Sequence, residues 1–349
     1  MQRTAWRISK LMKHFSSIYV LLKASSFRIY YRKNALGVVI SAVHIDAFLS
    51  VADPPSENTA FKAQMKEIWT ISEARFCVRI AISHDKEAQT VFLSQTALID
   101  RIITQFGQQD AYPIKTPMDP GLKLRRPNPS DVTTTRPNSP NTLIDPLSAV
   151  YLSTASRPEI TYAVQRLSQF LDSYSYAHWN AAICVIQHWY LKCTHDFELV
   201  LGGSNPINLR LMGFTDLDWA NCLDTRRSVG YSFTLSSGIV SWKQKTVTSS
   251  LCEAEYTTTY ECSKEEIWLW TLLSGIWFAP PGPTPILCDN NAAINLSEYS
   301  SLHQRVNHID IKYHFLHERV CSLWGTEIVL RQYPHWPATS SPKLLGPQN

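Results

Sequence analysis

The chain has 349 residues, of which 44 % are hydrophobic and 11 % are aromatic, including eleven Trp. This composition excludes a mainly disordered protein, and the length suffices for two or three domains with buried cores. Only twelve residues are Gly, about half the usual share of roughly 7 %, and neither a G-x-G-x-x-G nor a Walker A pattern occurs. The composition therefore argues against a Gly-rich phosphate-binding loop.

The formal net charge of +4 is unevenly distributed along the chain. Residues 1–45 carry eight basic side chains and no acidic one, whereas the remainder carries 25 basic and 29 acidic side chains. A basic N-terminal segment is typical of a surface that faces nucleic acid, and equally of an ordinary solvated surface.

The eight Cys include no C-x-x-C pair, which gives a zinc site little support. His314 and His317 share one helical face, but without further ligands a structural role is the simpler interpretation. No secretory signal pattern is present, and the apolar run at 18–22 is far too short to span a membrane. We therefore expect no membrane association and a reducing intracellular compartment, cytoplasm or nucleus, with most of the Cys as buried thiols.

The first 112 residues alternate between patterns typical of strands and of helices. Gly37 to Val43 is an apolar run typical of a buried strand. Residues 58–71 and 97–106 have the apolar spacing of helices, and residues 76–82 and 90–93 are short β-prone runs.

The composition changes at residue 113. Residues 113–146 are rich in Pro, Thr and Ser, which predicts a loop or linker. Two helices are predicted next, at 149–171 and 177–191. A β-prone segment begins at Leu209, and the chain contains no internal repeat.

The region from Leu209 onward carries the pattern with the most chemistry. Its predicted elements are strands at 209–214, 228–235 and 238–242, a helix at 250–276, a strand at 285–288, helices at 292–296 and 308–323, and a strand at 325–331. The first three strands predict an antiparallel meander, and Ser250 with Glu253 forms a capping box at the start of the long helix.

Three acidic residues fall at joints of this layout. Asp216 ends the first strand, Glu255 lies in the first turns of the long helix, and Asp289 ends the fourth strand. In a βββαβα order the first and fourth strands can be parallel neighbours with the helix packed across them, so the three carboxylates could converge. Carboxylate oxygens suit Mg²⁺ or Mn²⁺, which support phosphodiester hydrolysis. The alternative is that acidic residues are simply common at strand ends and helix starts.

Nine sequence blocks cover nearly the whole chain in the order and spacing of one known family. The blocks are FLSQTALIDRIITQFG (92–107), TPMDPGLKL (116–124), YLSTASRPEITYAVQRLSQF (151–170), HWNAAICVIQHWYLK (178–192), FTDLDWAN (214–221), DTRRSVGYSFTLSSGIVSWKQK (224–245), EAEYTTTYECSKEEIWLWTLL (253–273), CDNNAAINL (288–296) and HIDIKYHFLHERV (308–320). Together they resemble the C-terminal part of the Pol polyprotein of Ty1/copia-type retrotransposons, from the end of the reverse transcriptase through the RNase H domain.

The resemblance implies an α/β protein, with an α+β palm remnant followed by an RNase H-like mixed five-stranded sheet flanked by helices. The implied regions are a truncated reverse transcriptase palm and thumb remnant at 1–112, a Pro-rich linker at 113–146, a helical connection at 147–208, an RNase H-like domain at 209–335 and a C-terminal tail at 336–349.

Carried over by position, the family's RNase H carboxylates fall on Asp216, Glu255 and Asp289, with Asp218 and Glu253 as second candidates. The resemblance implies bound Mg²⁺ or Mn²⁺ and, as substrate, the RNA strand of an RNA–DNA hybrid, recognised through minor-groove shape and 2′-hydroxyls.

The fourth carboxylate of the family lies in a segment resembling ADILTK, whereas residues 331–349 of this chain contain no Asp or Glu. Asp310 is the substitute candidate, with a structural role at a helix start as the alternative. We therefore expect weakened hydrolysis.

The palm hairpin of the family reads Tyr-Val-Asp-Asp, and the matching residues here are His44, Ile45, Asp46 and Ala47. Because Ala47 replaces one of two metal-binding acids, the polymerase site is degenerate and polymerisation is predicted to be lost. Three classes of function stay open at this stage: a weakened RNase H, a nucleic-acid-binding remnant without chemistry, and a non-functional decayed copy of the element.

Overall fold

The computed structural model describes the ranges 18–23, 28–44, 47–68, 76–105, 124–128, 146–182, 190–203, 210–216, 227–236, 238–247, 251–276, 278–280, 282–288, 327–330 and 344–345, with residues 70, 117, 118, 122 and 184. The chain divides into two compact units, residues 1–82 with 267–280, and residues 83–266 with 281–349. Within the described residues, no helix is long and apolar enough to cross a membrane.

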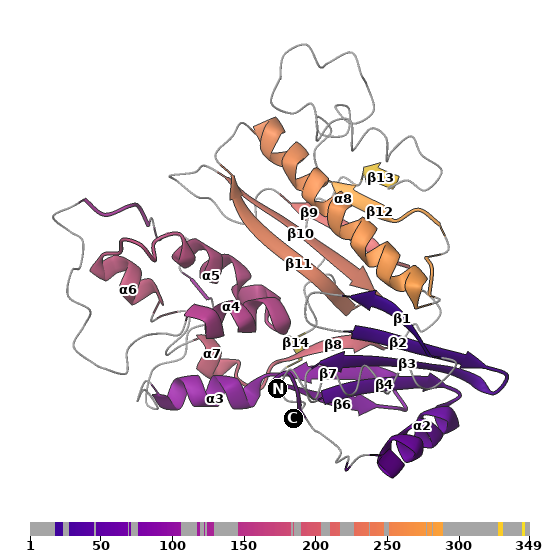
Figure 1. The fold of residues 1–349 in the computed structure, drawn as a ribbon. Helices are drawn as coiled ribbons and strands as arrows, with labels where there is room; N and C mark the ends of the chain where they lie inside the picture. The colour runs from indigo at the N-terminus through magenta and orange to yellow at the C-terminus, as the bar shows by residue number, and fades with distance from the viewer. Residues whose placement is uncertain are drawn as a thin grey trace, which may run out of the picture. The chain divides into compact units, whose positions relative to one another are not determined.

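The first unit contains an antiparallel four-stranded sheet with its strands in chain order (Figure 1). Its elements are β1 (Ile18–Lys23), β2 (Arg28–Asn34), β3 (Gly37–His44), β4 (Ala47–Asp53) and α2 (Pro55–Ile68). The predicted strand at 37–43 is confirmed. The predicted helix at 58–71 is present but begins at Pro55, where a fixed φ and a missing N–H are tolerated.

Side chains of β3 that point to one face of the sheet form part of the core of this unit. Val39 and Val43 are buried on the face of the sheet that packs against α2, together with Tyr30 of β2. Phe61 and Met65, four residues apart on α2, close the core from the helix side.

A second sheet has the strand order β14-β8-β7-β6-β5. Its strands are β5 (Phe76–Cys77), β6 (Ile80–Asp85), β7 (Thr90–Ser94), β8 (Glu198–Gly202) and β14 (Leu344–Leu345), and the boundary between the two units falls inside β6. The predicted strand at 76–82 is interrupted by a turn at Val78 and Arg79, which both have positive φ.

The sequence prediction missed β8, because residues 147–208 were assigned to a helical connection. Glu198–Gly202 is a five-residue strand with only three large apolar residues, Leu199 to Leu201, and it pairs with β7, more than 100 residues earlier in the chain. Such a short run is not distinguishable as a strand until its distant partner is known.

Helices form the middle of the second unit. They are α3 (Thr96–Gln105), α4 (Pro146–Ala155), the 3₁₀ turn η1 (Pro158–Ile160), α5 (Thr161–Ser168), α6 (Tyr176–Ala182) and α7 (Tyr190–Cys193). The single helix predicted at 149–171 is wrong. Arg157 leaves the helical region, with φ −125° and ψ 71°, because Pro158 disfavours helical geometry in the preceding residue and has no N–H to donate.

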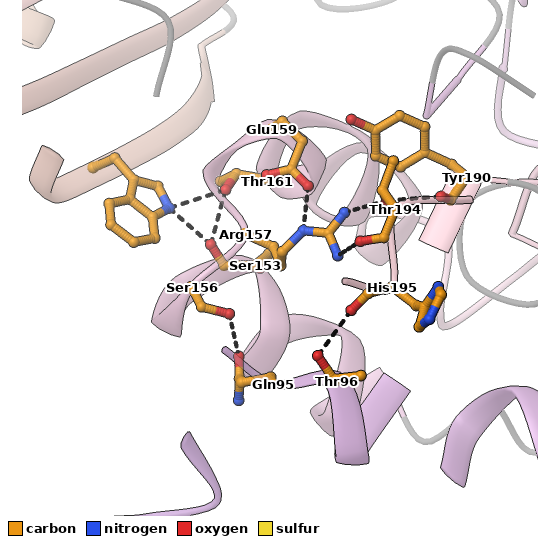
Figure 2. Close-up of polar contacts among 11 residues, drawn as sticks. Gln95, Thr96, Ser153, Ser156, Arg157, Glu159, Thr161, Tyr190, Thr194 and His195 are labelled. Carbon is orange, nitrogen blue, oxygen red and sulfur yellow. Dashed lines mark hydrogen bonds and ion pairs between the residues drawn. The ribbon is translucent and has the colours of Figure 1, made fainter. Parts of the chain in front are cut away.

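Arg157 also anchors these helices from the inside, with only 1 % of its surface exposed. Its Nε donates to Oε1 of Glu159 at 2.5 Å and its Nη1 to the Thr194 carbonyl at 2.9 Å, while Nη2 bonds to Thr194 Oγ1 (Figure 2). The guanidinium lies over the rings of Tyr190 and Phe197. We call these five residues the Arg157 cluster. It ties the break after α4 to the turn between α7 and β8.

The third sheet is mixed and has the order β11-β10-β9-β12-β13. Its elements are β9 (Met212–Asp216), β10 (Arg227–Leu235), β11 (Gly238–Val247), α8 (Leu251–Gly275), β12 (Pro285–Cys288) and β13 (Glu327–Leu330). β9, β10 and β11 form an antiparallel meander, and β12 is parallel to both β9 and β13. The predicted five-stranded mixed sheet, its meander and the parallel first and fourth strands are confirmed.

Close backbone packing at Gly213 joins three strands of this sheet. A Cβ at Gly213 would lie 2.9 Å from Cε1 of Phe233 on β10 and 3.1 Å from Cγ1 of Ile286 on β12. Figure 1 shows α8 lying along the sheet. The predicted helices at 292–296 and 308–323 and the Ser250 capping box lie outside what the structure describes.

Among the described strands, the edge strand β11 pairs with β10 alone, and it is also in contact with β8 and α5. At Gly238 an added Cβ would lie 2.9 Å from Cα of Leu201 on β8. Four residues further, Nε1 of Trp242 donates to the carbonyl of Ser153 at 2.7 Å and to Oγ1 of Thr161 at 3.1 Å. The meander and the helices before it therefore pack as parts of one unit.

Candidate active site

The strand pairing brings the ends of β9 and β12 side by side. Thr215 of β9 pairs with Cys288, the last residue of β12. Asp216 is the last residue of β9, and Asp289 is the next residue in sequence after Cys288. Because the two strands are parallel, both end at the same edge of the sheet.

The position of Asp216 can be followed across the meander. Gly230 of β10 pairs with Asp216 on one side and with Gln244 of β11 on the other. These three residues form one row across the sheet. β11 continues three residues past this row, to Val247, before the chain turns into α8.

Two side-chain contacts fix the direction of α8 on the sheet. Oγ of Ser241 donates to Oε1 of Glu265 at 2.7 Å, and Nζ of Lys243 lies 3.7 Å from Oε2 of Glu261. Moving towards the end of β11 therefore means moving towards the start of α8. Glu255 lies six residues before Glu261, about 9 Å further in that direction. The first turns of α8 thus lie at the edge where β9 and β12 end.

Burial along α8 indicates the face on which Glu255 sits. Thr259, Cys262 and Glu266 are buried at the three- and four-residue spacing of one helix face. Glu255 precedes Thr259 by four residues and Cys262 by seven, so it lies on the same stripe of the helix. The backbone therefore places Asp216 and Glu255 at one edge of the sheet.

The predicted ligands are described unevenly. The structure gives backbone positions, without side chains, for Asp216, Glu255 and Glu253, whereas Asp289, Asp310 and Asp218 lie outside the described residues. Among the side chains that are described, no three of His, Cys, Asp or Glu are grouped so as to hold a metal ion. The assignment of metal ligands stays a prediction.

A buried polar contact that was not predicted holds α8 in place. The Tyr231 hydroxyl donates to Oε2 of Glu265 at 3.4 Å, beside the bond from Ser241. Burial and the neighbouring Glu265 raise the pKa of Tyr231, so its hydroxyl stays a donor. Burial also raises the pKa of the Cys262 thiol well above its usual range. No local motif marks this contact, because its members lie 24 and 34 residues apart along the chain.

The residues predicted to match the palm motif include the ends of two strands of the first unit. His44, the last residue of β3, pairs with Ala47, the first residue of β4. Ile45 and Asp46 lie outside the described ranges. Ala47 opens β4 where the motif would require its second acid, and a methyl side chain cannot coordinate a metal ion.

The three sheets and their helices define an α/β protein, with one purely antiparallel sheet and one mixed sheet. The chain is 32 % identical over 294 residues to the retrovirus-related Pol polyprotein from transposon TNT 1-94 of Nicotiana tabacum, covering 81 % of this chain and 22 % of that protein. It is 28 % identical over 325 residues to the corresponding polyprotein from transposon RE1 of Arabidopsis thaliana, covering 91 % of this chain and 21 % of that protein.

A third relative, the polyprotein from transposon RE2 of Arabidopsis thaliana, is 32 % identical over 254 residues, covering 70 % of this chain and 16 % of that protein. The chain belongs to the retrovirus-related Pol polyproteins of copia-type transposons. It spans about a fifth of the length of these relatives. No protein-family model matches the chain, and no solved structure matches it.

Proposed function

We propose that the mixed sheet carries a weakened RNase H-type nuclease that hydrolyses the RNA strand of RNA–DNA hybrids. One observation supports the proposal: β9, β12 and the first turns of α8 lie at one edge of the sheet, and in the sequence Asp216 ends β9, Glu255 lies in those turns and Asp289 follows β12. Membership of the Pol family supports nucleic acid as the substrate class.

The donor set fits hard divalent cations. Asp216, Glu255 and Asp289 would hold Mg²⁺ or Mn²⁺, since these ions prefer carboxylate oxygens and retain water for phosphate substrates. When bound, such ions activate water and stabilise the leaving oxygen in phosphodiester hydrolysis. The chain's own part is to position the three carboxylates, and the Glu265 contacts to Tyr231 and Ser241 contribute by holding α8, which carries Glu255, on the sheet.

The weakening follows from the C-terminal sequence. Residues 331–349 contain no Asp or Glu, so the fourth carboxylate has no counterpart there, and Asp310 is the remaining candidate for that role. In the first unit, Ala47 leaves the palm hairpin without its second acid, and we propose that polymerase activity is lost. Nucleic-acid binding without hydrolysis is the second candidate function. It is favoured by the absence of an Asp or Glu for the fourth carboxylate in residues 331–349.

The deciding experiment is cleavage of a labelled RNA–DNA hybrid by the full chain, with Mg²⁺ or Mn²⁺. We expect slow metal-dependent cleavage that is lost in Asp216→Asn and retained in Asp100→Asn, an exposed acid on α3. Unchanged cleavage in Asp216→Asn would contradict the site. Full-rate cleavage by the wild type, abolished in Asp289→Asn, would contradict the weakening.

Three companion measurements complete the test: thermal unfolding, hybrid binding and primer extension. A cooperative thermal transition for each variant shows that loss of cleavage is not loss of folding. If the wild type binds the hybrid and never cleaves it, the second candidate function replaces the first. Detectable primer extension by the chain would contradict the proposed loss of polymerase activity.

A further inference from the structure

An exposed aromatic corner lies in the second unit between α5 and α6. Tyr176, the first residue of α6, is 68 % exposed, and Leu171 in the preceding turn is 59 % exposed. Tyr174 and Trp179 are partly exposed, with ring centroids 6.5 Å apart and planes tilted by 32°. Side chains of this size seldom stay in water without a binding role when they gather at one place.

The inner side of the corner is buried against a small core. His178 is buried against the Phe170 ring, with centroids 4.3 Å apart. Its Nδ1 accepts from the Ser175 backbone N–H at 3.2 Å, which closes the start of α6. Leu124, Phe170 and Ala181 form a small core beneath. The outer rings therefore project from a preformed support.

The chain segment at 124–128 packs beneath this corner through Leu124, and two arginines follow Leu124 in it. Nη2 of Arg166 on α5 donates to the Leu124 carbonyl at 2.6 Å, and the same guanidinium lies over Phe170. Leu124 is thereby buried, and the next two residues, Arg125 and Arg126, are exposed.

The charge balance of the corner is positive. Within the described residues of 122–128 and 169–182, Asp172 is the one acidic side chain. Arg125 and Arg126 are exposed and directly follow Leu124 of the small core beneath, so they add positive charge to the part of the unit that carries Tyr174, Tyr176 and Trp179. Aromatic faces next to arginines are the combination that binds single-stranded nucleic acid, because unpaired bases stack on the rings while phosphates meet the cations.

We propose that this corner, Arg125, Arg126, Tyr174, Tyr176 and Trp179, binds single-stranded RNA or DNA. A duplex is excluded as the preferred ligand because its base faces are already stacked on one another and cannot meet the rings. The proposal shares with the proposed function only the class of ligand. It places single-strand binding on the helices rather than at the acidic edge of the mixed sheet.

The test is fluorescence anisotropy of the full chain with labelled twelve-nucleotide oligo-U and oligo-dT, and with a blunt duplex of equal length. EDTA is present throughout, so that the acidic site neither cleaves nor contributes through a metal ion. Tyr176→Ser should weaken single-strand binding roughly fivefold or more. Phe76→Ser, which removes an exposed ring of the first unit, should leave it unchanged.

The arginines are tested separately through salt dependence. The double variant Arg125→Gln/Arg126→Gln should reduce the slope of log K against log salt by about 1.4 for single strands. Arg101→Gln, an exposed arginine on α3, should alter neither the corner nor that slope if the corner alone makes the contact. Circular dichroism of each variant confirms that the helices persist.

Three outcomes would overturn the proposal. They are unchanged single-strand binding in both Tyr176→Ser and the arginine pair, equal affinity for duplex and single strand, and loss of self-association in Tyr176→Ser by ultracentrifugation without any change in binding. Failure of the nuclease is distinguishable from failure of the corner, because Asp216→Asn should abolish cleavage without changing the anisotropy measured in EDTA.

Discussion

Arg32 in the first unit and Arg157 in the second are both buried arginines paired with a glutamate and stacked on an aromatic ring. Arg157 is 1 % exposed and all three of its nitrogens donate to protein oxygens. Arg32 is 9 % exposed, reaches Oε2 of Glu57 only at 3.5 Å, and its Nε has no hydrogen-bond partner in the described structure.

The difference shows that a buried cation is judged by how completely its donors are satisfied. A buried donor without a partner costs about 1–3 kcal/mol, whereas a satisfied one is roughly neutral or stabilising. Both arginines join distant segments: the Arg32 contacts join β2 to α2, 25 and 32 residues apart, and the Arg157 cluster joins segments 37 residues apart, so the satisfaction of the donors is what distinguishes the two sites. We therefore expect the two arginines to differ in their contribution to stability.

Arg157→Met carries the largest expected effect. It leaves the Glu159 carboxylate buried without its cation and the Thr194 carbonyl without its donor. Burial already raises the pKa of Glu159, although Arg157 opposes this, so removing the arginine favours the protonated form further. We expect a loss of about 3–5 kcal/mol in the free energy of unfolding, measured by urea denaturation. Arg101→Met is the exposed control. A loss below about 1 kcal/mol in Arg157→Met would contradict the expected difference between the two buried arginines.

Arg32→Met should have a smaller effect. The variant removes a poorly satisfied donor together with its contacts to Glu57, Gln64 and Phe61. Asn34 still donates to Glu57 at 3.5 Å. A loss of about 1–3 kcal/mol is expected in the same denaturation experiment. A loss equal to that of Arg157→Met would show that donor satisfaction does not separate the two sites.

Trp242→Phe tests how far the polar network around Arg157 extends. The variant keeps an aromatic ring and removes the Nε1 donor to Ser153 and Thr161, which flank the cluster on α4 and α5. We expect a loss of about 0.5–1.5 kcal/mol. Trp268→Phe, at a half-exposed position of α8, is the matched control and should be close to neutral. If Trp242→Phe and Trp268→Phe had equal effects, the polar network around Arg157 would not extend to Trp242 of β11.

The smallest expected effect is a pH dependence of stability that comes from His178. This residue lies beside a third buried arginine, Arg166. Burial lowers the pKa of His178 below its ordinary value of 6.5, and Arg166 acts in the same direction, whereas the Arg125 backbone opposes the shift. The folded state therefore holds this group neutral while the unfolded chain binds a proton. Its contribution to stability is complete above pH 6.5 and is lost as the pH falls towards the folded pKa.

His178→Gln isolates that contribution. A Gln three residues after Ser175 can still accept from the Ser175 N–H as in a capping box, but it does not titrate. The difference in melting temperature between pH 7.5 and pH 5.5 should therefore be smaller in His178→Gln than in the wild type. An unchanged difference would assign the pH dependence to other groups.

Much of the mixed sheet was predictable, because its strands have clear apolar runs and its βββαβα order restricts the pairing. β8 was not predictable, since its five residues acquire their role only from pairing with β7. The break at Pro158 had a visible signal in the sequence, and helical spacing on both sides obscured it. For the candidate site, the sequence predicts that Asp216, Glu255 and Asp289 converge, and this stays a prediction, because ligand geometry depends on side chains that spacing does not determine.

The contact between Gly238 and Leu201 sets a limit on how this chain can be divided. A polypeptide beginning at Leu209 would retain Asp216 and Glu255 but lose β8 and α5, so the edge strand β11 would lose the elements that pack against it and Trp242 would lose its hydrogen-bond partners. Exposed strand edges recruit further strands. The isolated segment from Leu209 onward should therefore aggregate, whereas one that starts before α4 should not.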